Sequence, residues 1–121
     1  MTNWLFLIVP VALLLCTPTS SSGQDAVAVS ADVYSVLFEN DEVRLMEMVY
    51  APGQRDAPHS HPKYAVSVME GGTLRAHLSD GGTVDNVVER GQTFLLDPVE
   101  RHWAENVGDT IIRVIVIEFK R

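Results

Sequence analysis

The stretch Gly53-Gln-Arg-Asp-Ala-Pro-His59-Ser-His61-Pro-Lys-Tyr-Ala-Val-Ser-Val-Met-Glu-Gly-Gly72 sets two histidines two residues apart, between a proline-bounded loop and an apolar run. Side chains two residues apart on an extended chain point to the same side. His59 and His61 can therefore aim both imidazoles at one point, as the ligands of a metal ion must. The pair alone is a weak signal, and its value depends on a third ligand from elsewhere in the chain.

Short apolar runs separated by turn residues fill the chain after residue 32, and no helical period interrupts them. The sequence Asp80-Gly81-Gly82 between two such runs indicates a hairpin. The pattern predicts an all-β fold of about eight strands, a sandwich or a small barrel. The predicted strands cover residues 33–38, 43–50, 65–69, 74–78, 84–88, 93–96, 102–106 and 111–119.

A third histidine, His102, begins the predicted strand 102–106, far along the chain from the first pair. Two ligands from one strand and one from a distant strand can build a three-ligand site in the mouth of a β-barrel. Three imidazoles suit a divalent ion of iron, zinc, manganese, nickel or copper. Such a set leaves coordination positions open for water and for a small-molecule substrate.

These spacings resemble the two motifs of the cupin superfamily, which cover most of residues 53–106. The residues that fall on the first motif are Gly53, His59, His61 and Gly72, and those on the second are Gly91, His102 and Asn106. The resemblance implies a double-stranded β-helix, also described as a jelly-roll barrel. It also implies that His59, His61 and His102 ligate one divalent metal ion.

Two parts of the motifs depart from the family pattern. Ala65 stands where the first motif has a glutamate ligand. In the second motif, Asp97 and Val99 replace a proline and a glycine, and Pro98 comes one place late. Three neutral imidazoles would leave the ion its full positive charge, which favours an anionic or chelating oxygen substrate. Some cupin oxygenases that act on diketones or small thiols are similar in using three histidines with iron.

The run after the histidines predicts the wall of a substrate pocket. If His59 and His61 face inward and no bulge intervenes, the same parity turns inward the small or soft side chains of Ala65, Ser67 and Met69. Tyr64 then has the opposite parity, so it packs elsewhere unless it turns inward as a catalytic acid or base.

His77 is a further candidate for the pocket, although its place in the sequence also suits a surface residue. It lies on the polar face of the predicted strand 74–78, together with Arg75. We interpret His77 as exposed or as a lining residue of the pocket.

The beginning of the chain resembles an export signal. Residues 4–15 are almost wholly apolar, and residues 17–23 are small and polar with one proline. We predict a signal peptide over residues 1–23, a flexible lead-in over 24–32 and one domain over 33–121, with the protein periplasmic or secreted. An uncleaved anchor is the alternative. Cleavage removes Cys16, the only cysteine, so the remaining domain can form no disulfide.

The net charge of −7 falls entirely on residues after 23. An acidic domain repels phosphate backbones and anionic lipid surfaces, so no nucleic-acid partner and no membrane contact beyond the signal segment is expected. We expect an exported cupin that acts on a small metabolite, with dioxygen-dependent cleavage on iron(II) as the specific version. A non-catalytic ligand-binding module and a metal-free isomerase or epimerase are the alternatives. The resemblance also implies a possible homodimer through sheet edges.

Overall fold

Strand β9 (Ile112–Phe119) shows how the sequence pattern becomes a sheet. Its side chains alternate strictly between buried and half-buried, so that Ile112, Val114 and Val116 point inward. β-Branched residues favour this pleated, half-buried surface. The next inward residue is Glu118, which is only 3% exposed, so the strand carries a carboxylate into the interior. Strand β9 lies between β2 (Val43–Tyr50) and β4 (Tyr64–Glu70), at the centre of its sheet.

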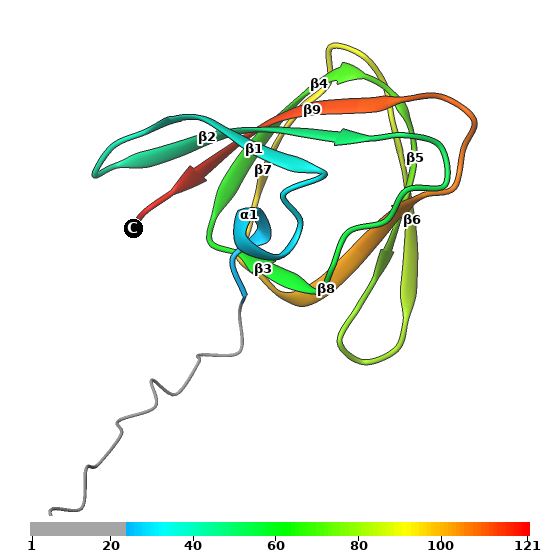
Figure 1. The fold of residues 1–121 in the computed structure, drawn as a ribbon, viewed down its shortest axis with the longest axis horizontal. Coiled ribbons are helices and arrows are strands. Elements are labelled where there is room, and N and C mark those ends of the chain that lie inside the picture. The colour runs from blue at the N-terminus through cyan, green and yellow to red at the C-terminus, as the bar shows by residue number, and fades with distance from the viewer. Residues whose placement is uncertain (1–23) are drawn as a thin grey trace, which may run out of the picture.

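The computed structural model describes residues 24–121, so the predicted signal peptide lies outside the described residues. One helical turn and nine strands make up this part of the chain, coloured in order in Figure 1. No helix of the described residues is long and apolar enough to cross a membrane. The remaining elements are α1 (Ala26–Val29), β1 (Tyr34–Glu39), β3 (His59–His61), β5 (Gly72–His77), β6 (Thr83–Val88), β7 (Thr93–Leu96) and β8 (Val99–Asn106).

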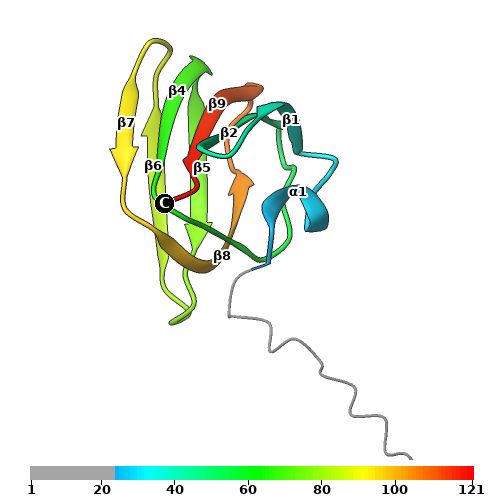
Figure 2. The ribbon, with the colours of Figure 1, turned by 90° about the vertical axis from the view of Figure 1, so that its left-hand side faces the viewer.

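The strands form two sheets that face each other, as the two views in Figures 1 and 2 show. One sheet has the order β1-β2-β9-β4-β7 and the other the order β3-β8-β5-β6. The predicted all-β class is confirmed. The strand count is nine because the short segment of the two histidines pairs with β8 as a strand of its own.

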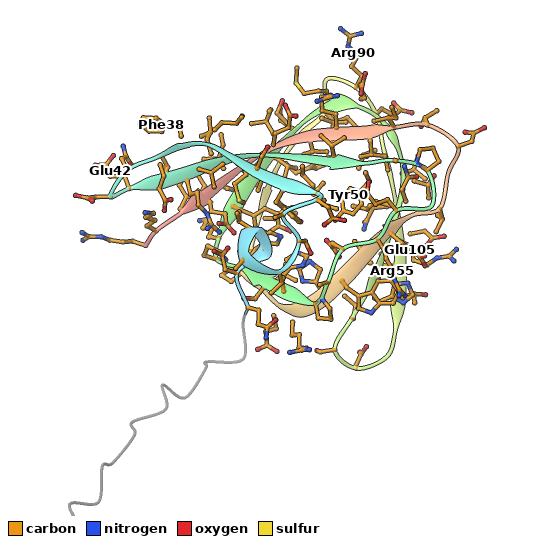
Figure 3. All side chains as sticks on the ribbon, in the orientation of Figure 1. Phe38, Glu42, Tyr50, Arg55, Arg90 and Glu105 are labelled. Atoms are coloured by element: carbon orange, nitrogen blue, oxygen red, sulfur yellow. The ribbon has the colours of Figure 1, made fainter. Side chains whose placement is uncertain are left out.

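The core fills the space between the two sheets. Its largest fully buried side chains include Tyr50, Met46, Ile112, Val68 and Val116, and Figure 3 shows Tyr50 pointing inward. Burial of one such apolar side chain contributes about 1.5–3 kcal/mol. Residues 24–121 contain no cysteine, so this packing stabilises them without disulfides.

The segment predicted as a lead-in is attached to the strand of the histidines. Helix α1 lies beside β3 in Figure 1. The backbone N–H of Ser60 donates to the carbonyl oxygen of Gln24 at 3.0 Å. The N–H of Ala57 donates to the hydroxyl oxygen of Ser30 at 2.7 Å. Residues 24–30 therefore brace β3 from the side opposite its partner strand β8.

Candidate metal centre

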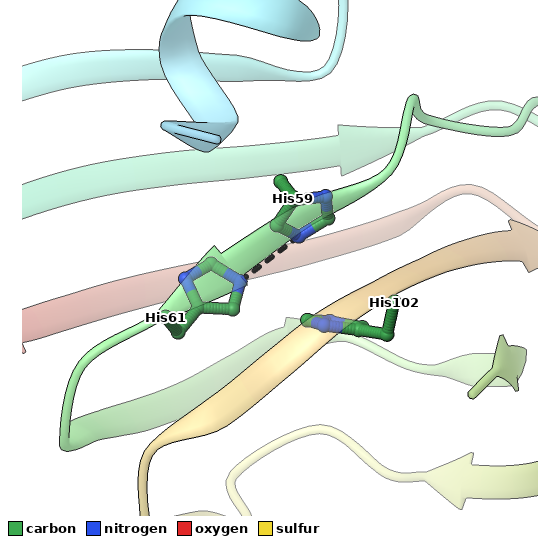
Figure 4. A group of neighbouring side chains, drawn as sticks. All are labelled: His59, His61 and His102. Carbon is green, nitrogen blue, oxygen red and sulfur yellow. Dashed lines mark hydrogen bonds between the residues drawn. The ribbon is translucent and has the colours of Figure 1, made fainter. Parts of the chain in front are cut away.

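The pairing of β3 with β8 brings the three predicted ligands together. His59 and His102 are direct cross-strand partners, and His61 follows His59 on the same strand. One ring nitrogen from each of the three lies within 4.8 Å of the others. Figure 4 shows the three rings converging, with a dashed line between His59 and His61. The Nε2 atoms of these two residues are 3.1 Å apart.

The Nδ1 atom of each ring faces a hydrogen-bond acceptor. In His59 and in His102 it lies 2.8 Å from the carbonyl oxygen of the residue two places earlier. In His61 it lies 2.8 Å from a carboxylate oxygen of Glu118. A carbonyl or carboxylate oxygen can only accept, so Nδ1 carries the proton in each neutral ring. In each neutral ring Nε2 then carries a free lone pair, and this is the form of imidazole that binds a metal ion.

The donor set fits a divalent ion of the transition series. The Nε2 atoms of His59 and His61 both present lone pairs, so their 3.1 Å contact contains no hydrogen to share. A cation at the point where the three lone pairs meet would turn this repulsion into coordination. Three imidazoles with an open side suit zinc, iron, copper, nickel or manganese.

Burial favours the neutral form of two of the three ligands, His59 and His102. Desolvation by burial lowers the pKa of His59. Desolvation also lowers the pKa of His102, with a smaller contribution from His59. Both rings therefore keep the lone pair available at neutral pH.

Behind His61 runs a chain of charged groups that ends at the lead-in. Arg44 donates from Nε to the second oxygen of Glu118 at 2.9 Å and also pairs with Asp25 at 2.6 Å. Burial alone would raise the pKa of Glu118, but hydrogen bonds from His61 and Arg44 outweigh it and lower that pKa. An ionised carboxylate on Nδ1 fixes the tautomer of a ligating histidine and makes Nε2 more basic.

Tyr34, at the start of β1, is a site residue that the sequence reasoning missed. Its hydroxyl oxygen lies 3.2 Å from Nε2 of His59 and 3.4 Å from Nε2 of His61. The side chain is buried, and burial, followed by the negative charge of Asp56, raises its pKa. Nothing in the local sequence marks this tyrosine, because its direction follows from the pairing of β1 with β2.

A largely apolar cavity of about 570 Å³ extends from the histidines into the barrel. His61, His102 and Tyr34 form part of its wall, and the ring of Tyr64 lies 4.8 Å from that of His61. The apolar part of the wall includes Met48, Val66, Val68, Leu74, Val84, Val88, Phe94, Leu96, Val114 and Val116. The volume lies within the ordinary range for small-ligand sites.

The predicted parity of β4 was wrong. Tyr64, Val66 and Val68 line the cavity, whereas Ala65, Ser67 and Met69 are absent from its wall, and Met69 is 47% exposed. The alternation does not carry over from β3, because β3 and β4 belong to different sheets and the pairing of β3 with β8 shifts register between the two histidines.

The same parity decides whether the position matched to the motif glutamate lines the cavity. Val66 faces the interior, and Ala65, the position matched to the motif glutamate, does not line the cavity. Neither side chain can ligate a metal ion. The site therefore has no carboxylate ligand from β4, as the sequence indicated, although a different residue fills the interior.

His77 does not line the cavity, so its interpretation as a lining residue of the pocket was wrong. Its ring stacks on Trp103, with centroids 3.6 Å apart and planes 3° apart. Its Nε2 atom lies 2.9 Å from a carboxylate oxygen of Glu105. The guanidinium group of Arg55 lies over the ring of Trp103, 5.7 Å from its centroid. Figure 3 shows Arg55 and Glu105 together on the outside of the molecule.

The sequence model of the cupin domain family matches residues 46–118, well over half of the chain. The chain is a cupin. A cupin domain from Bordetella pertussis Tohama I superposes with a TM-score of 0.68 at 27% identity, over 74% of this chain and 93% of the other. A cupin family protein with a double-stranded β-helix fold from Methanocaldococcus jannaschii gives 0.58 at 16% identity, over 72% and 78% of the two chains.

A germin-like protein of Arabidopsis thaliana, subfamily T member 3, is 31% identical to this cupin over 78 residues. The match covers 62% of this chain but only 34% of the plant protein. The cupin thus spans about a third of the length of this curated relative. Together with the three neighbouring histidines, membership of the family makes the site compatible with metal binding.

Proposed function

We propose that this cupin binds one divalent metal ion through His59, His61 and His102 and acts on a small molecule with an apolar body and an oxygen-bearing head. The observation that carries the proposal is the convergence of three Nε2 lone pairs at the wall of an apolar cavity. Export to the periplasm or the medium, expected from residues 1–23, is part of the same proposal.

The chain's own residues divide the cavity into polar and apolar parts. His61, His102 and Tyr34 form one polar part of the wall, and Asp85 and Asn86 of β6 form another. Between them, β4, β5 and β9 contribute mainly aliphatic side chains. An apolar ligand body would be desolvated among the aliphatic side chains, at about 25 cal/mol per Å² of area removed from water. Its oxygen atoms would then be directed toward the histidines.

The ligating rings are held in place before any ion arrives. The carbonyl oxygens that accept from His59 and His102 fix those two rings, and Glu118 fixes His61. A divalent ion held there supplies a Lewis acid that polarises the ligand's oxygen atoms and, if it is iron(II), the means for dioxygen chemistry. Dioxygen-dependent cleavage of a diketone, catechol, flavonoid or thiol is the specific version of the proposal.

Metal content of the purified protein tests the site directly. We expect about one equivalent of metal per chain by elemental analysis, and its loss in His102→Ala. The matched control is His77→Ala, which removes the one histidine of the chain that is not in the three-histidine cluster. A full metal complement in His102→Ala would end the three-histidine assignment.

Oxygen consumption separates the enzymatic version from a binding module. Protein loaded anaerobically with iron(II) is offered each substrate class in turn, and oxygen uptake above the His102→Ala background supports a dioxygenase. The lack of a carboxylate ligand from β4 favours the second candidate, a module that binds its ligand without turnover. That candidate predicts saturable ligand binding to the wild type, loss of binding in His59→Ala, and no oxygen uptake.

A further inference from the structure

We propose that Tyr34 is the fourth metal-binding side chain of this site, with its phenolic oxygen in the place of the carboxylate that β4 does not supply. The inference rests on the proposed function, since it requires a metal ion at the three histidines. It assigns a ligand to strand β1, outside the two sequence motifs that carry the histidines.

The distances among three donor atoms match one face of a coordination polyhedron. The Nε2 atoms of His59 and His61 are 3.1 Å apart, and the oxygen of Tyr34 is 3.2 Å from the first and 3.4 Å from the second. Four ligands at about 2.0–2.1 Å from a tetrahedral ion are separated by about 3.3 Å. A phenol placed only for packing has no reason to complete this triangle.

Hydrogen bonding alone does not satisfy the triangle. In their neutral, metal-binding form both imidazoles present lone pairs at Nε2, because their Nδ1 atoms donate to Ala57 and Glu118. The hydroxyl of Tyr34 has one hydrogen to give, so at most one of the three contacts can be a hydrogen bond. The other two bring acceptor against acceptor in a buried place, where such contacts are costly. A single cation satisfies all three.

Strand β1 and the lead-in hold the ring in this position. The N–H of Tyr34 donates to the carbonyl oxygen of Ser30 at 2.9 Å, and the hydroxyl of Ser30 accepts from Ala57 at 2.7 Å, close to the first histidine. The Cα of Tyr34 pairs across the sheet with that of Met48. The tyrosine and the histidine strand are thus fixed to each other through one serine.

Ligation by Tyr34 changes the charge of the centre. The metal–oxygen bond forms as the phenol O–H bond breaks, and the proton leaves to solvent. The resulting tyrosinate lowers the net charge of a divalent ion and its ligands from about +2 to about +1, which a glutamate ligand would also do. The site then accepts a singly anionic ligand with near neutrality, so the preferred substrate is a monoanion with an apolar body.

Visible absorption of the iron(III)-loaded protein tests the assignment. A tyrosinate bound to iron(III) gives a ligand-to-metal charge-transfer band in the visible region, which three histidines alone do not give. We expect the band in the wild type and in Tyr64→Phe, and its loss in Tyr34→Phe with iron still bound. Tyr64→Phe is the matched control, because Tyr64 is the other tyrosine whose ring lies beside His61.

The possible results separate two failures. A wild type that binds one iron(III) per chain without a visible band overturns the role of Tyr34 and leaves the three-histidine site standing. A wild type that binds no metal overturns both. A band that survives in Tyr34→Phe, or disappears in Tyr64→Phe, also overturns the inference. If Tyr34→Phe does not fold, a band retained in Tyr50→Phe and Tyr64→Phe assigns it by elimination, because the chain has three tyrosines.

Affinity for zinc gives a second readout that needs neither colour nor turnover. Competition with a chelator should show that Tyr34→Phe loses more zinc affinity than the roughly 10–100-fold typical for groups that only support a ligand, whereas Tyr64→Phe should bind zinc as tightly as the wild type. Circular dichroism of the metal-free proteins checks that the fold is kept. Equal zinc affinity in folded Tyr34→Phe and wild type would contradict ligation.

Discussion

The two faces of strand β8 each carry a cluster that contains histidine, and the clusters differ in whether the Nε2 atoms are free to bind a metal ion. On the inner face, His102 meets the two histidines of β3 and leaves its Nε2 free. On the outer face, His77 of β5 stacks on Trp103, and its Nε2 lies against Glu105. His102 and Trp103 are neighbours in sequence, so the pleat alone sends them to opposite sides.

The difference lies in which nitrogen meets the acceptor. In the inner cluster every acceptor occupies Nδ1, so three lone pairs remain and converge. In the outer cluster the carboxylate of Glu105 occupies Nε2, and the nearby Trp103 offers a ring surface and no ligand atom. A histidine beside a carboxylate therefore indicates a metal site only when it is known which ring nitrogen faces the carboxylate, because the other nitrogen must be free to bind the ion.

The largest expected effect is the loss of an inner histidine. His61→Ala should weaken zinc binding by more than about 100-fold, beyond the 10–100-fold typical for groups that only support a ligand. Isothermal titration of zinc into the metal-free protein measures it. His77→Ala should bind as the wild type does, and equal losses in the two variants would erase the distinction between the clusters.

Next in size is the loss of the carboxylate behind an inner histidine. Glu118→Gln keeps an oxygen for Nδ1 of His61 but removes its charge, so zinc affinity should fall about 10–100-fold. The matched change on the outer face is Glu105→Gln, which should leave the affinity unchanged. Competition with a chelator measures both, and a loss of affinity in Glu105→Gln would contradict the comparison.

The outer cluster should affect stability without affecting metal binding. Trp103→Leu removes a stacked pair and should lower the free energy of unfolding by about 0.5–1.5 kcal/mol beyond the lost burial. Urea unfolding of the metal-free protein measures it. Zinc affinity should stay at the wild-type value, and a decrease would show that the outer face supports the ligands.

The smallest effect concerns the far end of the charged chain behind His61. The pKa of Asp25 is lowered, chiefly by its hydrogen bonds from Arg44. A lowered carboxyl pKa contributes stability above the unfolded value of 3.8 that is lost as pH falls through the folded pKa. Because Asp25 is 45% exposed, this contribution should be only about 0.2–1 kcal/mol.

Urea midpoints at pH 6 and pH 3 test this last expectation. Wild type should lose more stability on acidification than Asp25→Asn, in which the residue no longer titrates. The inner histidines are common to both proteins, so their own titration cancels in the difference. An identical decline in the two proteins would mean that the ion pair with Arg44 does not stabilise the fold.

The fold and the three inner histidines could be predicted because their signals are local. Alternating apolar residues define strands such as β2 and β9, and the fixed spacings around His59, His61 and His102 match a known pair of motifs. Glu118 could have been found as well. It continues the inward parity of Ile112, Val114 and Val116, so the same alternation predicts a buried carboxylate.

Other parts of the site depend on contacts between distant segments. Tyr34 points at the histidines because β1 pairs with β2 and the lead-in joins β3, which no short pattern reveals. The inward face of β4 could not be derived from His61, since the chain passes from one sheet to the other between them. Parity is reliable within one strand and is lost at each change of sheet.

The order of strands also bears on how a ligand reaches the cavity. Strands β6 and β7 each end their own sheet, and side chains of both, such as Val84 and Phe94, line the cavity. No ladder of backbone hydrogen bonds joins these two strands, so a ligand that passes between them displaces side chains and breaks no strand pairing. Rotations of exposed side chains take picoseconds to nanoseconds, whereas opening a sheet is far slower. The rate of ligand exchange should therefore be limited by how tightly the inner cluster holds the ligand, because the side chains of the barrel wall move faster than the ligand dissociates.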